Sequence, residues 1–368
     1  MRWLAAVCCF VFSLSTTLSP TSRVRAQEAA ELLPSSTAIY VEIAAPKETL
    51  AAVLDHPIRR QLDELPEYKQ LFESNEFKQF RLGVGWVELA MTTPWRTAVE
   101  SLTEGGVYFA ADPALGGAAM LLRAKDEATL KRFFDLGVKL VKDDARKKGQ
   151  DERVKSGEYR GITAHRIDKL RMAAVGRWLV LSDNDEVGKT LLDALLDGNK
   201  ENLASDAKFK AALAARGGKP AAWAYVRLDD LRDRGFAGGL RKGKADNPAA
   251  ELIAGGLLSV LQHTPVVTAR IDVDATDARL AVQMPIDKQW LPASRSYYFG
   301  PDAKGAAPRP LAPPGTILNL TAYRDLGGFW NAAPDLFDEA TNSQLVQANS
   351  NLSTLFSGQD FGQDVLTT

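Results

Sequence analysis

The segment from Arg177 to Gly198, RWLVLSDNDEVGKTLLDALLDG, constrains the fold of this chain most strongly. Trp178 to Leu181 is a short apolar run of the kind that forms a buried strand. Ser182 and Asp185 then give S-x-x-D, a spacing that lets a hydroxyl and a carboxylate accept the free N–H groups of a helix start. Apolar residues recur at helical spacing as far as Leu196, and Gly198 is a typical helix stop. The segment therefore predicts a strand, a polar cap and an amphipathic helix.

Units of the same kind recur along the chain at uneven intervals. They begin near Thr37, Ala118, Trp178, Ala222 and Ile317. Spacings of about 40 to 95 residues are too irregular for a solenoid. The connections around Gly157 and Ala275 are rich in strand patterns. We therefore expect an α+β fold, with a largely antiparallel sheet, helices packed on one face and strand–cap–helix units repeated by divergent duplication.

The first 26 residues have the pattern of a signal peptide. Arg2 supplies the positive start, Trp3 to Leu14 is apolar, and Val24-Arg25-Ala26 resembles a cleavage site. We expect cleavage after Ala26, an exported mature chain that begins at Gln27, and a periplasmic or extracellular location. An uncleaved anchor is the alternative, although the run is shorter than the roughly 20 apolar residues of a membrane span. The mature chain is expected to contain no transmembrane span.

The leader also holds both cysteines, Cys8 and Cys9. Lipidation is disfavoured because Cys8 follows Val7 inside the apolar run. A mature chain without cysteine excludes disulfides, thiolate nucleophiles and cysteine-bound metals. The leader contains three arginines and no acid, so the chain's 45 basic and 46 acidic residues become 42 and 46. This balance argues against nucleic acid as a partner, since nucleic-acid binding requires a basic excess.

Length and composition predict more than one domain. A mature chain of about 340 residues exceeds the usual size of one hydrophobic core. Residues 301–315, PDAKGAAPRPLAPPG, contain five prolines and two glycines, which is typical of a linker. We predict an α+β module over residues 27–300, this linker, and the start of a second module over residues 316–368. Leu33 to Ile43 and Ala312 to Ala322 align as proline-led turns before apolar runs. The second copy would then be incomplete at Thr368, and a frayed C-terminus is the alternative.

Three phrases of the sequence carry a family resemblance. They are LPSSTAIYVEI, RWLVLSDNDEVGKTLL and NLASDAKFKAALAARGGKPAAWAYVRLDDL. Together they resemble a bacterial family of exported proteins that is catalogued only as a domain of unknown function. The phrases consist of apolar patterns and helix caps. The resemblance implies an envelope or secreted location and a tandem arrangement of similar halves, and it carries over no activity, cofactor or site residue.

A glycine-rich motif at Gly238 to Ala245, GGLRKGKA, resembles a phosphate-binding loop. Ala245 stands where that loop needs a serine or threonine hydroxyl for Mg²⁺. Asp246 to Pro248 also separate the motif from the next helix, and export makes nucleoside triphosphates scarce. We interpret the segment as a flexible basic loop.

The candidate metal ligands are dispersed. Asp272, Asp274 and Asp277 resemble part of a calcium loop, but the EF-hand glycine and the final glutamate are missing, so a hairpin turn is favoured over weak calcium binding. Three histidines, His56, His165 and His263, lie about a hundred residues apart with no zinc-binding spacing. We interpret them as structural.

The remaining motifs have ordinary explanations. Ser357-Gly358 lacks the first glycine of a nucleophile elbow, and Gly83-Val84-Gly85 lacks the third glycine of a dinucleotide turn. Asp229-Asp230 lies at an expected helix start, where the helix dipole favours acids. Two glycosylation patterns, at Asn319 and Asn351, are common by chance. We therefore assign no catalytic, cofactor-binding or metal-binding residue.

The sequence has the apolar spacing of a folded core, but no motif that would bring polar catalytic or ligand-binding groups together. It therefore favours a non-catalytic exported envelope protein. It would act as a scaffold or binding module for an envelope or secreted partner. One alternative is an extracytoplasmic hydrolase whose carboxylates meet only in the fold, which requires two facing acids in a deep pocket, one with a raised pKa. Another is a carrier of a small hydrophobic ligand, which requires an apolar pocket.

Overall fold

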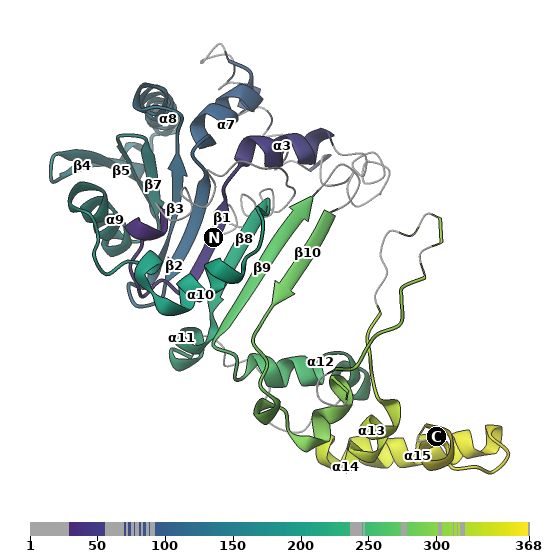
Figure 1. The fold of residues 1–368 in the computed structure, drawn as a ribbon. Coiled ribbons are helices and arrows are strands. Elements are labelled where there is room, and N and C mark those ends of the chain that lie inside the picture. Colours follow the sequence, from purple (N-terminus) through teal and green to yellow (C-terminus); the bar gives the residue numbers. More distant parts are fainter. Residues whose placement is uncertain are drawn as a thin grey trace. The chain divides into compact units, whose positions relative to one another are not determined.

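The computed structural model describes residues 29–55, 93–235, 247–273, 278–300 and 321–366, and scattered positions between these ranges (Figure 1). The contacts divide the chain into two units. The first unit comprises Met1–Arg227 and Val266–Gln283, and the second comprises Leu228–Pro265 and Met284–Thr368. The leader, at residues 1–26, lies outside the described residues. This division differs from the one expected at residues 301–315, because residues 228–265 pack with the part of the chain that begins at Met284.

A ten-stranded sheet forms the centre of the first unit, with every described strand pair antiparallel. Its order is β10-β9-β8-β1-β2-β3-β7-β6-β5-β4. The strands are β1 Ile39–Ile43, β2 Val107–Asp112, β3 Gly117–Arg123, β4 Val154–Tyr159, β5 Ile162–Ile167, β6 Leu170–Val175, β7 Trp178–Ser182, β8 Ala222–Arg227, β9 Val266–Val273 and β10 Ala278–Gln283. The expected α+β class with a large antiparallel sheet is confirmed.

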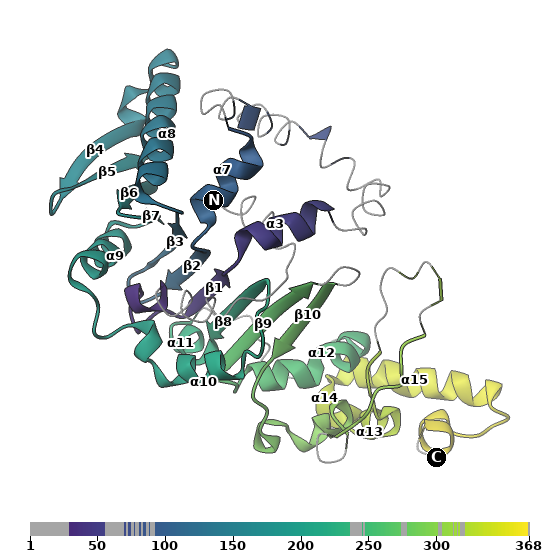
Figure 2. The same cartoon turned by 45° about the horizontal axis from the view of Figure 1, so that its top comes forward.

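Helices of the first unit cover parts of both sheet faces. They are α3 Pro46–Asp55, α7 Trp95–Thr103, α8 Glu127–Lys147, α9 Asp185–Asp197 and α10 Ala207–Ala215. Leu191 of α9 packs on the face of Ala173 in β6. Phe134 of α8 contacts His165, and His165 is paired with Met172, so it points to the opposite face from Ala173. Figure 2 shows α8 and α9 on opposite sides of the β4–β7 end. We predicted helices on one face of the sheet. The structure also has a helix, α8, on the opposite face.

The core of the first unit is an aromatic cluster on one sheet face. Alternate residues of β1, β2 and β8 point inward, because side chains alternate between the two faces of a strand. Phe209 of α10 meets Tyr40, Trp223 and Tyr225 edge-on, with ring centroids 5.1–5.7 Å apart. Tyr108 lies beside Tyr40 at 6.4 Å. Burial of each such side chain contributes roughly 1.5–3 kcal/mol before entropy costs.

The segment from β7 to α9 has the predicted order, but its cap differs. Asn184 is the N-cap, and its side chain accepts the Glu186 N–H at 2.7 Å. Ser182 is instead the last residue of β7, and its hydroxyl donates to the Asn184 carbonyl at 3.1 Å. The S-x-x-D prediction was therefore wrong by two residues, because sheet pairing with Ala119 holds Ser182 in the strand. Gly198 ends α9 with a φ of 76°, which favours glycine.

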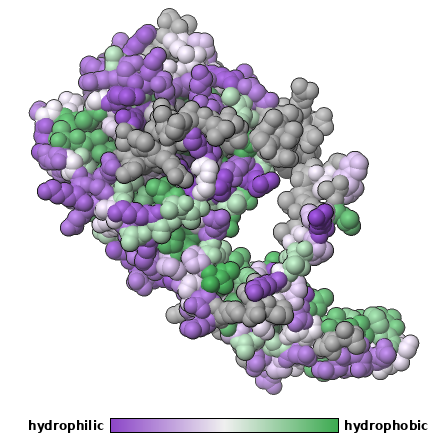
Figure 3. Space-filling view, in the orientation of Figure 1, coloured by the Kyte–Doolittle hydropathy of each residue, from purple (hydrophilic) through white to green (hydrophobic). Residues whose placement is uncertain are grey.

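The described part of the second unit is helical. Its elements are α11 Leu228–Asp233, α12 Pro248–Leu261, η3 Lys288–Trp290, η4 Ala293–Tyr298, α13 Leu326–Asn331, α14 Ala333–Leu336, α15 Glu339–Leu355 and η6 Phe361–Leu366. Tyr297, Phe329 and Phe337 form its core. Val346 and Leu355 of α15 are exposed. Figure 3 shows hydrophobic residues on the visible surface of this unit. Among the described residues, no helix has the length and apolar character that crossing a membrane requires.

Gly255 of α12 leaves room for the carboxylate of Glu251 on the same helix. A Cβ at that position would lie 1.9 Å from a carboxylate oxygen of Glu251. Glu251 is buried, and Arg295 of η4 binds both of its oxygens, at 2.5 and 2.9 Å. Arg295 also donates to the Ser259 hydroxyl at 2.8 Å. A buried ion pair thus joins α12 to η4 inside the second unit.

Candidate functional site

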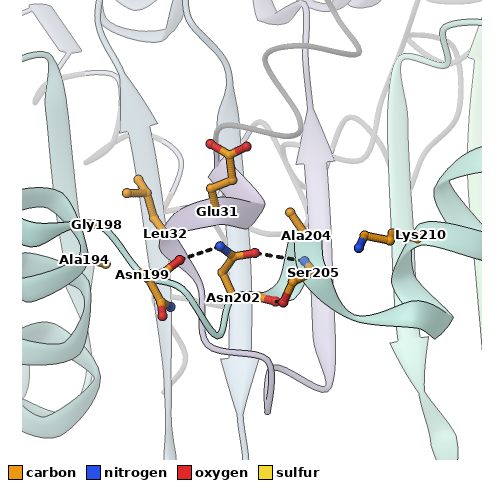
Figure 4. A pocket seen from close by; sticks show the side chains of 9 residues that line it. All are labelled: Glu31, Leu32, Ala194, Gly198, Asn199, Asn202, Ala204, Ser205 and Lys210. Carbon is orange, nitrogen blue, oxygen red and sulfur yellow. Dashed lines mark hydrogen bonds between the residues drawn. The ribbon is translucent and has the colours of Figure 1, made fainter.

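A surface cleft of about 520 Å³ lies in the first unit (Figure 4). It lies where the chain before β1 meets the end of α9, the short helix η2 Leu203–Ser205, and α10. The lining combines apolar, amide, hydroxyl and charged groups, from Glu31, Leu32, Ala194, Gly198, Asn199, Asn202, Ala204, Ser205 and Lys210. Its walls come from segments about 170 residues apart.

The amide groups of Asn202 hold one wall of the cleft in place. Its side-chain Oδ1 accepts the Ser205 N–H at 2.9 Å, as expected for an N-cap, and its Nδ2 donates to the Asn199 carbonyl at 2.5 Å. The Ser205 hydroxyl donates to the Asn202 carbonyl at 2.6 Å. These bonds fix the turn between α9 and α10 before any ligand binds.

Backbone hydrogen bonds tie this turn to the chain before β1. The N–H of Leu203 donates to the Leu33 carbonyl at 2.9 Å, and the N–H of Ser35 donates to the Glu201 carbonyl at 3.1 Å. Asn202 also forms an isolated bridge with Pro34. The two walls of the cleft are therefore connected by main-chain bonds and are preorganised.

Two charged side chains line the cleft, Glu31 and Lys210. Both are exposed, and among the residues that the structure describes neither forms an ion pair. Figure 4 shows Lys210 projecting toward Ser205, whereas the carboxylate of Glu31 points away from the amides. The cleft lining thus contains one carboxylate without a second acid facing it. This arrangement offers hydrogen bonds and charge to a ligand, but it lacks the pair of acids that hydrolysis through carboxylates requires.

Two deeply buried charged side chains of the first unit, Glu42 and Arg216, lie outside the cleft lining. Each side chain is 2% exposed, and Arg216 Nη1 donates to Glu42 Oε1 at 2.6 Å. Tyr40 donates to the other carboxylate oxygen at 3.1 Å. Arg216 also lies over the Trp223 ring, 5.7 Å from its centroid. Burial raises the pKa of Glu42 above its ordinary value, and the Arg216 guanidinium opposes that rise.

A raised carboxyl pKa is one feature that the hydrolase hypothesis requires, but the surroundings of Glu42 do not fit it. Its partners are a cation and a phenol, and with 2% exposure the carboxylate is closed to substrate. Glu251 in the second unit is similarly held by Arg295, with its side chain 3% exposed. Both buried acids therefore act in packing.

Each of the two described histidines lies within hydrogen-bond distance of a residue of its own unit. His165 Nδ1 lies 2.9 Å from the Ser156 hydroxyl, and burial followed by the charge of Lys142 lowers the pKa of His165. His263 Nδ1 lies 2.9 Å from the Ser259 carbonyl. His56 is outside the described residues. Within the described ranges, no group of three or more His, Cys, Asp or Glu side chains could hold a metal ion.

Asp272 of β9 pairs with Arg270, whereas Asp274 and Asp277 lie outside the described residues. The glycine-rich motif is also outside them up to residue 244, and Ala245 forms a parallel bridge with Phe337.

The other sequence motifs lie apart from the cleft. Asp229 and Asp230 occupy the first turn of α11. Ser357 and Gly358 follow α15, and Asn351 lies within that helix. Gly83 and Asn319 are outside the described residues.

Sequence reasoning did not identify the residues that line the cleft. The phrase N-L-A-S-D around Asn202 is a recognisable cap, so the turn itself could have been found. The approach of Glu31 to this turn depends on pairing between segments far apart in the chain, for which no local pattern exists. Exposed Lys210 resembles any solvated lysine of a helix.

Known structures resemble this chain in part, whereas the comparisons by sequence find no match. No family model matches this chain, and no curated protein matches it in sequence. Solved structures of TP0453 in crystal forms IV, III and I are similar in part. Each is 10% identical, with TM-scores of 0.35–0.36, covering 70–71% of this chain and 78–82% of the other.

Proposed function

We propose that this chain is a non-catalytic exported protein of the cell envelope that acts as a binding module. The observation that carries the proposal is the composition of the preorganised cleft. Its amides and hydroxyl already hold the wall through local bonds, and its two charges are Glu31 and Lys210. The signal-peptide pattern of residues 1–26 supports export.

The lining favours a polar partner, such as an extended polypeptide segment, over a small hydrophobic ligand. A carrier pocket for such a ligand is mostly apolar. Here Asn199, Asn202, Ser205 and the two charged residues share the surface with Leu32 and two alanines. A peptide could accept a hydrogen bond from Lys210 and donate one to Glu31, because both side chains are exposed.

Site-specific crosslinking in envelope extract tests this proposal. A photoreactive group at Ser205 of the tagged full-length chain should capture a defined partner that unlabelled chain displaces at saturation. Lys210→Glu and Glu31→Lys should weaken capture at least tenfold. Lys208→Glu, on an exposed position of the same helix outside the lining, is the matched control and should not. Non-saturable capture, or equal loss with the Lys208 variant, would refute binding at the cleft.

A further inference from the structure

The two edges of the ten-stranded sheet differ in their protection. The edge strand β4 carries Lys155, Gly157 and Glu158, and charges and glycine weaken pairing with another chain. The opposite edge, β10, exposes Leu280 by 65% and Val282 by 52%. Among the described strands, β10 pairs with β9 alone. The strand β10 carries one charge, Arg279, and no glycine, so its edge is less protected than that of β4 and is a template for further strand pairing.

The side chains of β10 divide cleanly between the two faces. Leu280 is opposite Ile271 and Val282 is opposite Ala269, so one face is apolar up to the edge. Arg279 is on the other face, opposite Asp272. Asp272 in turn pairs with Arg270. An added strand must therefore offer apolar residues on one face and uncharged or acidic residues near Arg279 on the other.

We propose that β10 pairs with β10 of a second copy of this chain, antiparallel about a two-fold axis at Ala281. Residues opposite each other in an antiparallel pair share a face. In this register, Leu280 faces Val282 of the partner subunit, and Arg279 faces Gln283 of the partner subunit. Apolar side chains thus meet apolar ones, and the two arginines avoid each other. The sequence Ala278–Gln283 is complementary to itself in this way.

A two-fold arrangement also explains why such an edge does not lead to open-ended aggregation. Each copy offers one β10 edge, so the pairing closes at two subunits. The charged edge at β4 blocks growth at the far side of each sheet. Pairing of six-residue strands buries less than the ~1,200 Å² of a stable interface, so the dimer should dissociate on dilution.

Sedimentation velocity on the full chain over a wide concentration range should show a reversible monomer–dimer equilibrium. Leu280→Lys with Val282→Lys should weaken association at least tenfold. Mixing this variant with Leu280→Glu/Val282→Glu should restore it, because each lysine then faces a glutamate. Val346→Lys, at a position with 67% exposure on α15, is the matched control and should dimerise normally. Unchanged dimerisation of the double-lysine variant, or a chain monomeric at every concentration, would overturn the proposal.

Disulfide trapping tests the register separately. In a chain carrying Cys8→Ser and Cys9→Ser, Ala281→Cys should crosslink on oxidation, because the two residues lie opposite each other within disulfide reach. Leu280→Cys should not crosslink, since its counterpart lies two residues along the partner strand. Both positions are on the surface of an edge strand, and circular dichroism should confirm that both variants fold. Crosslinking at position 280 with none at position 281 would overturn the two-fold axis at Ala281.

Discussion

Replacing Arg216 by methionine should destabilise the first unit, because the carboxylate of Glu42 would remain buried without a cation. The Arg216 guanidinium lies 2.6 Å from Glu42, and both side chains are 2% exposed. Breaking a buried pair by removing one partner costs about 3–5 kcal/mol. Methionine keeps the apolar stem beside Trp223, so the loss of charge dominates. The expected loss is a large fraction of the roughly 5–15 kcal/mol that stabilises a typical domain.

The loss should depend on pH. Burial raises the pKa of folded Glu42 above its ordinary value of 4.5, and Arg216 lowers it, so the variant should raise the folded pKa further. A raised carboxyl pKa means that the folded state holds its proton more tightly than the unfolded state. The penalty is therefore absent below about pH 4.5 and grows as pH rises through the folded pKa. We expect a smaller loss at pH 5 than at pH 8.

Hydrogen exchange of peptides from β1 and β8 measures this loss directly, because these strands carry Glu42 and Trp223. The double variant Glu42→Leu/Arg216→Met removes both charges and should recover most of the stability, since well-packed apolar replacements of a buried pair are often neutral. A loss below about 1 kcal/mol at pH 8 would refute the reasoning. Equal losses at both pH values, or a double variant as unstable as the single one, would also refute it.

Three further predictions concern other contacts. Gly255→Ala should destabilise the second unit by about 1–3 kcal/mol in thermal unfolding, because the new Cβ would clash with the Glu251 carboxylate; an unchanged midpoint would contradict this packing. Asn184→Ala should cost about 1 kcal/mol in urea unfolding through the lost cap of α9, and no loss would argue against the cap. His165 should titrate below 6.5 by NMR, and Lys142→Gln should move its midpoint upward; a midpoint above 6.5 would contradict this burial.

Local patterns predicted the strand and helix types well, because their signals lie within one element. The apolar run before Ser182 and the helical spacing after it gave β7 and α9. The cap was displaced to Asn184 because pairing with a neighbouring strand decides where β7 ends. The helix layer formed by α8 on the second face was missed, since an amphipathic stripe does not say which sheet face it covers.

Contacts between polar groups that are far apart in the sequence could not be predicted. Glu42 and Arg216 are 174 positions apart, and each alone resembles an ordinary exposed charge. The cleft likewise forms only where the segment that contains Glu31 packs against the turn at Asn202, and no local pattern predicts this contact. We predicted the domain boundary at residues 301–315 because a Pro-rich composition is typical of linkers. Contacts, in contrast, assign residues 228–265 to the second unit, and an inserted segment has no compositional signature.

The insertion of residues 228–265 between β8 and β9 affects how the sheet is completed during synthesis and how the units can be separated by proteolysis. Residues 228–265 leave the ribosome before β9 and β10, so the growing sheet ends for a time at β8, with Trp223 and Tyr225 on its last strand. A fragment truncated at residue 227 would keep that unfinished edge permanently. One that stops at residue 283 would complete the sheet but carry an orphaned α12, whose contacts with η4 come later in the chain. Neither unit can therefore be released by a single proteolytic cut.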